Sequence, residues 1–202
     1  MYPLDDGLRH TLLGVARRAV VRAVESREIL EDLPSDEVLK RPAGAFVTLH
    51  RFGRLRGCVG QLASNDALVA VVAYCAMAAA LEDPRFTPMI AADLDGLAIE
   101  ISVLSALMDI TPHEIQLGKH GLLVSYEGKR GVLLPQVAVE FGWNATRFLE
   151  ETCVKAGLER SAWTEPGARV QGFTAEVFSE PGFHDGARPK GSSTKPDYST
   201  SM

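Results

Sequence analysis

A repeated order of predicted elements constrains the fold of this 202-residue chain more than any other feature. Alternating apolar residues and turn residues predict a hairpin, a helix and a further strand, and then the same order again. The predicted strands cover residues 45–51, 55–62 and 97–104, then 121–126, 131–134 and 170–178. The strand starts at 45 and 55 recur at 121 and 131, and residues 98–101 fall on 174–177 by the same offset. We interpret this as an internal ββαβ duplication, but few residues are identical, so coincidental spacing is an alternative.

The first predicted helix covers residues 5–26, where apolar residues recur every three or four positions. Acidic residues at its start suit a helix N-terminus. Its side chains Arg9, Arg17 and Arg22 form no single basic stripe. We therefore predict that these arginines face solvent.

The second predicted helix begins after a side-chain cap at Ser64 or Asn65 and ends near Leu81 or Glu82. It is apolar nearly all round. Its uncharged run at 67–81 is shorter than the stretch of about 20 apolar residues that a membrane span needs. We therefore predict a helix that is buried on several sides.

The net charge and the cysteine content limit the classes of protein to which this chain can belong. A formal net charge of −5 argues against nucleic-acid binding, which favours a basic excess. Cys58, Cys75 and Cys153 are too few and too scattered for a disulfide framework or a zinc site. We expect a cytoplasmic chain with no nucleic-acid or membrane partner and no signal peptide. Residues 1–179 should form the folded domain, and residues 180–202, which are almost free of apolar side chains, a disordered tail.

The first hairpin contains an unusual strand, Leu55-Arg56-Gly57-Cys58-Val59-Gly60, in which glycines stand on both sides of a cysteine. A two-residue turn at 52–53 would place His50 opposite Leu55, whereas a three-residue turn at 52–54 would place it opposite Arg56. Only the three-residue turn separates an apolar face from a polar one, so we predict that turn. The apolar face would carry Val47, Leu49, Leu55 and Val59, and the polar face Thr48, His50, Arg56 and Cys58.

The predicted polar face brings together groups that can do chemistry. Cys58 is a candidate nucleophile or modified thiol, with His50 as a proton acceptor and Arg56 as the partner of a thiolate or an anion. Glu100, in the middle of a predicted strand, is a candidate orienting or acid group. Gly57 would leave room for a ligand or another backbone to approach closely, as would Gly60.

Each of these residues also has a structural interpretation. A single cysteine in a strand is usually a small buried hydrophobe. Glu100 is more often found on an exposed strand face, and His120, at the entry to a strand, in a turn. Cys58, His50 and His120 could share a metal, but their spacing does not require one, and we expect no metal or cofactor.

Motifs of several enzyme classes are missing from the sequence. It contains no GxxxxGK[ST] phosphate loop, no GxGxxG after a strand and no HExxH zinc motif. It also contains no GxSxG nucleophile elbow. These absences set aside P-loop, dinucleotide-binding, metalloprotease and α/β-hydrolase chemistry.

A series of motifs follows in order across residues 8–178. They are GAFVTLH (44–50), LRGCVG (55–60), DPRFTPM (83–89), IEISVL (99–104), GKHG (118–121), LPQV (134–137) and GW (142–143). Together with CVKAGL at 153–158, this series resembles the AMMECR-like domain family, in the bacterial and archaeal form called AmmeMemoRadiSam system protein A. Val59 stands where isoleucine is commoner, a conservative change.

The resemblance implies an α+β fold in which the two ββαβ-like halves form a larger and a smaller subdomain, with the Arg-Gly-Cys strand near a cleft between them. It also implies a shared modification pathway with a Memo-like protein and a radical S-adenosylmethionine enzyme. No established activity comes with the family. This chain lacks a CxxxCxxC iron–sulfur motif, so it is not the radical enzyme itself.

We therefore expect an accessory or ligand-binding component of that pathway. The alternative is a cysteine-dependent enzyme or modified-thiol acceptor that uses Cys58, His50 and Glu100 as catalytic residues. Residues that bind a substrate or ligand are then expected at Arg56, Gly57, Gly60, Arg85 and His120.

Overall fold

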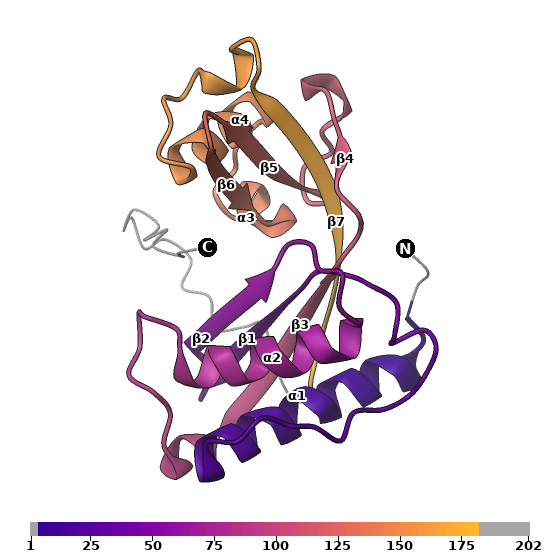
Figure 1. The fold of residues 1–202 in the computed structure, drawn as a ribbon. Helices are drawn as coiled ribbons and strands as arrows, with labels where there is room; N and C mark the ends of the chain where they lie inside the picture. Colours follow the sequence, from indigo (N-terminus) through magenta and orange to yellow (C-terminus); the bar gives the residue numbers. More distant parts are fainter. Residues whose placement is uncertain (1–3, 182–202) are drawn as a thin grey trace. The chain divides into compact units, whose positions relative to one another are not determined.

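The chain forms an α+β fold, as predicted, and divides into two compact units. The computed structural model describes residues 4–181. Within them, unit 1 runs to Val103 and resumes at Glu176, and unit 2 covers Leu104–Ala175. Both units combine helices with antiparallel strands (Figure 1). The cleft between subdomains that the resemblance implies stays a prediction.

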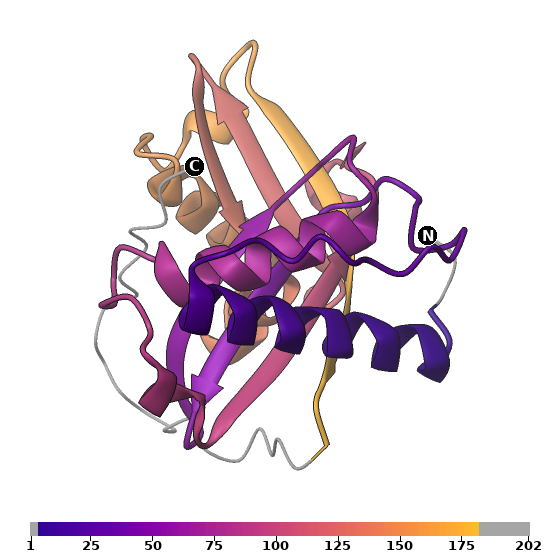
Figure 2. The ribbon, with the colours of Figure 1, turned by 60° about the horizontal axis from the view of Figure 1, so that its bottom comes forward.

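Unit 1 places two long helices on one face of an antiparallel sheet. Its strands are β1 (Ala45–Arg51), β2 (Arg54–Gln61), β3 (Leu97–Leu104) and the C-terminal end of β7 (Arg169–Ser179). β1 lies between β2 and β3 and pairs antiparallel with both. The helices α1 (Asp6–Ser26) and α2 (Leu68–Leu81) lie side by side over the sheet, and the short 3-10 helix η1 (Ala91–Leu94) precedes β3 (Figure 2).

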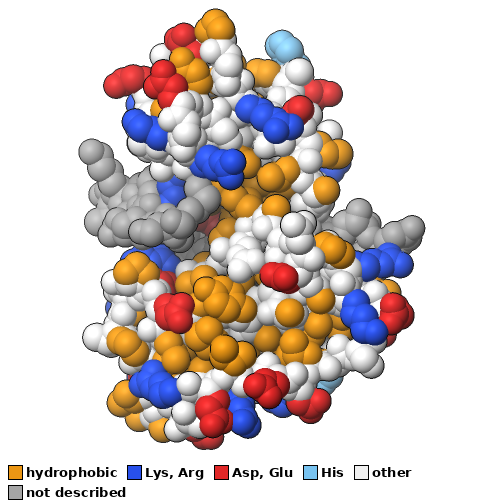
Figure 3. Space-filling model, viewed as in Figure 1, with side chains coloured by type: hydrophobic (Ala, Val, Ile, Leu, Met, Phe, Trp, Pro, Cys, Tyr) orange, Lys and Arg blue, Asp and Glu red, His pale blue; other side chains and the backbone are white. Residues whose placement is uncertain are grey.

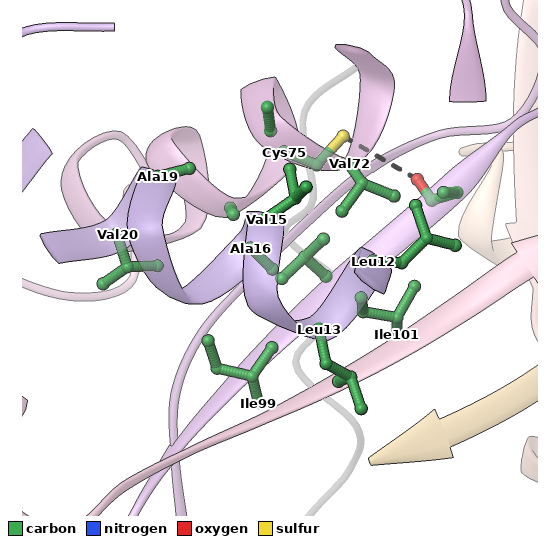
Figure 4. Packing of buried hydrophobic residues seen from close by; sticks show 14 of the residues in the cluster. Leu12, Leu13, Val15, Ala16, Ala19, Val20, Val72, Cys75, Ile99 and Ile101 are labelled. Atoms are coloured by element: carbon green, nitrogen blue, oxygen red, sulfur yellow. Dashed lines mark hydrogen bonds between the residues drawn. The ribbon is translucent and has the colours of Figure 1, made fainter. Parts of the chain in front are cut away.

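The core of unit 1 lies between these helices and the sheet. Alternation along a strand sends every second side chain to the helix face, and apolar spacing does the same for one stripe of each helix. Figure 4 shows the side chains that meet there, among them Leu12, Val15, Val72, Cys75, Ile99 and Ile101. Cys75 Sγ lies 3.8 Å from the Ala45 carbonyl oxygen and is fully buried, so this thiol is a core residue.

Unit 2 repeats the arrangement on a smaller scale. Its strands are β4 (Met108–Asp109), β5 (His120–Tyr126), β6 (Lys129–Leu133) and the first part of β7. β5 lies between β6 and β7, and β4 pairs with β7. The helix α4 (Ala145–Lys155) packs on β5 and β6. The shorter helices are η2 (Pro112–Glu114), α3 (Pro135–Glu140) and η3 (Ala162–Thr164).

The two units share the ββαβ topology that the sequence predicts, but not its uniform offset. The hairpins close with the pairs Arg51–Arg54 and Tyr126–Lys129, so Arg51 corresponds to Tyr126 and, along the same strands, Ala45 to His120. Ala45 pairs with Val103 and His120 with Thr174, so in the third strand Val103 corresponds to Thr174, at a smaller offset. Different connection lengths in the two units account for the change, and the alignment of 98–101 with 174–177 is wrong.

The predicted three-residue turn of the first hairpin is wrong. The turn has two residues, Phe52 and Gly53, whose φ values of 48° and 74° suit the tight turns that join twisted antiparallel strands. It places His50 opposite Leu55, but a β-bulge then adds Arg56 to β2. The bulge restores the predicted pairing of Thr48 with Cys58. A binary pattern cannot distinguish one longer turn from a short turn plus a bulge, because both shift the register by one residue.

The predicted side-chain cap of α2 at Ser64 or Asn65 is also wrong. The residue before the helix is Ala67, which has no side chain able to accept a hydrogen bond. The first two helical amides instead donate to the carbonyl oxygens of Arg41 and Leu39, at 3.0 and 3.1 Å. Backbone from a distant loop thus satisfies the helix N-terminus, which no local pattern can reveal.

α2 is buried on several sides, as predicted, but one side reaches the surface. Its residue Tyr74 is 45% exposed, although the helix contains no charged side chain. Figure 3 shows apolar side chains gathered on the surface over this helix. No helix in residues 4–181 is long and apolar enough to cross a membrane.

Two arginines predicted to face solvent hold the end of β7 against α1. Arg9 binds the Glu176 carboxylate through Nε and Nη2, at 2.9 and 2.7 Å. Arg17 binds both oxygens of Glu180, with its Nε 2.9 Å from Oε1 and its Nη2 bound to Oε2. Eight residues of helix span about 12 Å and four residues of strand about 13 Å, so the two spacings match. Each pair joins the two ends of the described chain, so the helix sequence alone could not predict it.

Glu180 is the first residue of the predicted tail, and it has defined contacts. Its Oε2 accepts a hydrogen bond from the Ile99 amide at 3.0 Å, and its own amide donates to the Ile99 carbonyl oxygen at 3.0 Å. The predicted tail from residue 182 onwards lies outside the described residues.

We expect Arg17→Ala to lower the free energy of unfolding by about 1 kcal/mol, because it removes a forked, partly buried charge-assisted pair. Arg22, on the same helix, pairs with Glu28 at an exposed position, and Arg22→Ala should cost less than about 0.5 kcal/mol. Urea unfolding of the two variants measures the difference. Equal effects would show that the Arg17 pair is no more than a surface ion pair.

We expect Gly57→Ala to destabilise the chain by about 3 kcal/mol, because a Cβ at this position would lie 2.0 Å from the Ala79 carbonyl oxygen of α2. A Cβ at Gly14, in the middle of α1, would meet its nearest neighbour only at 3.8 Å, so Gly14→Ala should stabilise by about 0.5 kcal/mol or more. Denaturant unfolding tests both signs. A Gly57→Ala variant as stable as the native chain would contradict the close approach of α2 to β2.

Candidate functional site

Three polar side chains form one row across the sheet of unit 1. Thr48 on β1 lies opposite Cys58 on β2 and opposite Glu100 on β3. The neighbouring residue Gly57 faces α2, so alternation turns this row to the sheet face away from the helices. The Thr48 hydroxyl contacts the Cys58 Sγ at 3.4 Å, and both side chains are partly exposed. We call Cys58, Thr48 and Glu100 the polar row.

An ion pair closes the outer edge of β2 at Cys58. The Cys58 amide donates to Asp83 Oδ2 at 2.8 Å, and Arg85 Nη2 donates to the Cys58 carbonyl oxygen at 3.4 Å. Asp83 is only 5% exposed and is held by Arg85 through Nε and Nη2, at 3.0 and 2.7 Å. An edge strand exposes unpaired backbone groups, and here side chains supply an acceptor and a donor as a neighbouring strand would.

The local sequence explains why Asp83 and Arg85 reach β2. α2 ends before Asp83-Pro84, because proline cannot continue the helix. The Asp83 side chain also accepts the Arg85 amide at 3.1 Å, which folds the chain into a tight turn. The Met89 amide then donates to the Ala80 carbonyl oxygen at 2.8 Å, which fastens the loop back onto the end of α2.

Burial raises the pKa of the Cys58 thiol, and this is the largest influence on it. The hydrogen bond with Thr48 and the positive charge of Arg85 act in the opposite direction, while the charges of Asp83 and Glu100 raise the pKa further. The thiol is therefore neutral at neutral pH. Burial also acts to raise the pKa of Asp83, but hydrogen bonds from Arg85 and from the amide of Cys58 lower it overall, so this carboxylate is ionised.

Arg56, predicted to accompany Cys58, points to a different set of partners. Its Nη2 binds Asp93 Oδ2 at 3.0 Å and the Thr87 carbonyl oxygen at 2.9 Å. Arg51 binds the other oxygen of Asp93 at 2.7 Å. Arg56 thus fastens the loop before β3 to the hairpin, and Arg85 is the guanidinium that lies beside Cys58.

The protein itself occupies the space beside both candidate binding glycines. Gly57 admits the backbone of α2, since a Cβ there would meet the Ala79 carbonyl oxygen at 2.0 Å. Gly60 admits the aromatic ring of Phe46 from the paired strand, which a Cβ there would meet at 2.1 Å. These glycines serve packing, and neither leaves open space at its Cα for a ligand.

The two candidate histidines lie in different units. His50 lies on β1 two residues from Thr48, and therefore on the same face, but opposite Leu55 rather than Arg56 as predicted. His120 begins β5 in unit 2, where its Nδ1 accepts the Gln116 amide at 3.2 Å. This hydrogen bond with a backbone amide four residues earlier is typical of a structural residue in a turn.

Asp83 is the residue of this site that the sequence-based prediction missed. Its signal was present, because an aspartate before proline at a helix end, two residues before an arginine, can bond back to its own loop. Its contact with the Cys58 amide joins distant positions in the chain and has no local signature. Within residues 4–181, no three His, Cys, Asp or Glu side chains lie close enough to hold a metal ion.

Comparisons with known proteins agree with this fold. The AMMECR1 family matches residues 13–178. A protein of Methanothermobacter thermautotrophicus is 38% identical over 190 residues, which cover 89% of this chain and 98% of that protein. A protein of Thermococcus gammatolerans is 39% identical over 194 residues, which cover 89% of this chain and 94% of that protein.

A solved structure supports the same assignment. The crystal structure of an uncharacterised protein from Pyrococcus horikoshii matches with a TM-score of 0.78 and 38% identity, over 84% of this chain and 90% of that one. The family match covers more than half of the sequence, and relatives share more than a third of their residues with it across nearly their whole length. The chain therefore belongs to the AMMECR1 family.

Proposed function

We propose that this protein is an accessory or ligand-binding component that acts with a Memo-like protein and a radical S-adenosylmethionine enzyme in a modification pathway. The partners are those that the resemblance to the AmmeMemoRadiSam form implies. We assign the role to the cytoplasm, since Cys58, Cys75 and Cys153 are all free thiols, as a reducing compartment favours.

The observation that carries a binding role is the neutral thiol of the polar row. A cysteine nucleophile needs a thiolate, which enzymes favour with nearby positive charge or a helix N-terminus. Here burial, together with the charges of two carboxylates, outweighs the Thr48 hydrogen bond and the guanidinium of Arg85, so the pKa of Cys58 is raised. A partly exposed row of thiol, hydroxyl and carboxylate can instead bind a ligand or partner by hydrogen bonds.

A second candidate is a cysteine-dependent enzyme or modified-thiol acceptor that uses Cys58 with His50, Arg56 and Glu100. The observation in its favour is the contact of the Cys58 sulfur with the Thr48 hydroxyl, which together with Arg85 acts to lower the pKa of the thiol. An acceptor thiol also need only be reachable by a reactive partner. This candidate requires that a ligand or partner change the charges around Cys58 before reaction.

We expect Cys58→Ala to retain at least about half of the pathway activity, because a binding role needs the shape of the row more than the thiol. The measurement is consumption of S-adenosylmethionine when the variant is co-expressed with its Memo-like and radical-enzyme partners, with a pull-down of those partners beside it. Cys153→Ala, which removes a buried thiol of unit 2, is the matched control for general destabilisation. Lost activity with intact folding and partner binding would overturn the binding role in favour of chemistry at Cys58.

A further inference from the structure

The turn of the first hairpin carries an exposed aromatic side chain. Phe52 is 66% exposed and takes the first position of the two-residue turn, with a φ of 48°. A turn with positive φ at both positions favours Asn-Gly or Asp-Gly, because most side chains are strained in this conformation. The equivalent hairpin of unit 2 has the exposed Glu127 at this position, with a φ of 49°. The turn itself therefore does not require an aromatic ring.

The ring of Phe52 is held in one position although most of it is exposed. The Phe52 amide donates to the Gly96 carbonyl oxygen at 3.0 Å, and the ring lies over Gly96, where a Cβ would meet it at 2.2 Å. The guanidinium carbon of Arg51 lies 5.2 Å from the ring centroid, a cation–π contact. A side chain that is already ordered loses little conformational entropy on binding, so this ring suits the role of an anchor.

Ile90 is a second exposed apolar side chain beside this turn. It is 59% exposed and directly precedes η1, which Figure 2 shows beside the turn between β1 and β2. The Ile90 amide donates to Asp93 Oδ2 at 3.2 Å, and Asp93 Oδ1 accepts Arg51 Nη1 at 2.7 Å. Arg51 therefore links the ring of Phe52 to the loop that carries Ile90.

The charge around these two apolar side chains is positive. Arg51 and Arg56 share the single carboxylate of Asp93. Arg54 is exposed, and its side chain has no partner within residues 4–181. With Asp95 included, segments 51–56 and 90–96 contain three arginines and two aspartates, a net charge of +1 in a chain whose formal net charge is −5. We call the following four residues the hairpin-tip surface: Arg51, Phe52, Arg54 and Ile90.

We propose that the hairpin-tip surface docks one of the two pathway proteins, the Memo-like protein or the radical S-adenosylmethionine enzyme, in an apolar groove rimmed by Asp and Glu side chains. Phe52 and Ile90 stand on a turn and a loop, so a concave partner is needed to bury them. Arg54 faces the acidic rim, which steers the two proteins together. Aromatic residues and arginine are enriched at the centres of protein interfaces. The proposal rests on the proposed function, which supplies the partners, and adds the surface at which one of them binds.

The test is the affinity of the purified full chain for the Memo-like protein and for the radical enzyme of the same organism, each measured separately by biolayer interferometry. For Phe52→Asn we expect binding to one of them to weaken at least about tenfold, because the anchor ring is lost. Asparagine suits the positive φ of the turn, so the hairpin should keep its structure. For Ile90→Ser we expect binding about fivefold weaker.

The charge of the surface is tested by Arg54→Glu. We expect about tenfold weaker binding at low salt, mainly through slower association, and we expect the affinity of the native chain to fall as salt is added. Unit 2 offers matched controls, because Glu127 and Lys129 take the positions of Phe52 and Arg54 in its hairpin. Glu127→Asn and Lys129→Glu should bind like the native chain.

Thermal unfolding checks that each variant folds. Unchanged affinity in Phe52→Asn, Ile90→Ser or Arg54→Glu would overturn the proposal, and so would an equal loss of affinity in the two controls. If Phe52→Asn does not fold, Ile90→Ser and Arg54→Glu decide.

The same measurement separates this proposal from the proposed function. A native chain that binds a pathway protein, with variants that bind equally well, would remove the docking surface and leave the proposed function standing. A native chain that binds neither protein would overturn both. Lost pathway activity in Cys58→Ala with intact partner binding would change the role of the polar row and leave the docking surface standing.

Discussion

One extra residue in β2 determines how the polar row is built. The bulge at Arg56 follows a two-residue turn and returns Cys58 to the rung of Thr48. It also directs the Arg56 guanidinium to Asp93 and to the Thr87 carbonyl oxygen, so the loop between α2 and β3 is fastened to the hairpin. Bulges re-aim side chains and disrupt pairing locally. Here the bulge links the register of the strand to the position of the loop that carries Asp83 and Arg85.

Unit 2 shows the same scaffold without this specialisation. Its hairpin turns at Glu127 and Gly128 with φ values of 49° and 78°, much like the first hairpin, and its strands pair without a bulge. Gly131 admits the backbone of α4 as Gly57 admits that of α2. The rung equivalent to the polar row, counted from these glycines, consists of Val132, Leu123 and Gln171. Because the second copy folds with aliphatic side chains at two of these three positions, the fold itself does not require a thiol and a carboxylate in the first.

The parts of the structure that sequence could predict are those with a local cause. The strands and helices follow apolar periodicity and turn residues, and all six predicted strands form within one or two residues of the expected bounds. The errors arise where a distant group decides. The start of α2 depends on carbonyl oxygens from residues 39 and 41, and Arg17 depends on Glu180. The bulge escaped prediction because a longer turn produces the same alternation of apolar and polar positions.

The candidate site shows the same division between local and distant causes. Thr48 and Cys58 were placed together correctly because the predicted longer turn and the observed bulge shift the register by the same one residue. Arg56 was assigned to Cys58 because it stands two residues away in the strand, yet Asp93 competes for it and holds it elsewhere. Arg85 takes that place because its partner Asp83 is already fixed by the Cys58 amide. A buried carboxylate is costly unless it is paired and hydrogen-bonded. The buried Asp83 therefore requires Arg85 as its partner. The positive charge of Arg85 lies beside Cys58 as a consequence of this pairing.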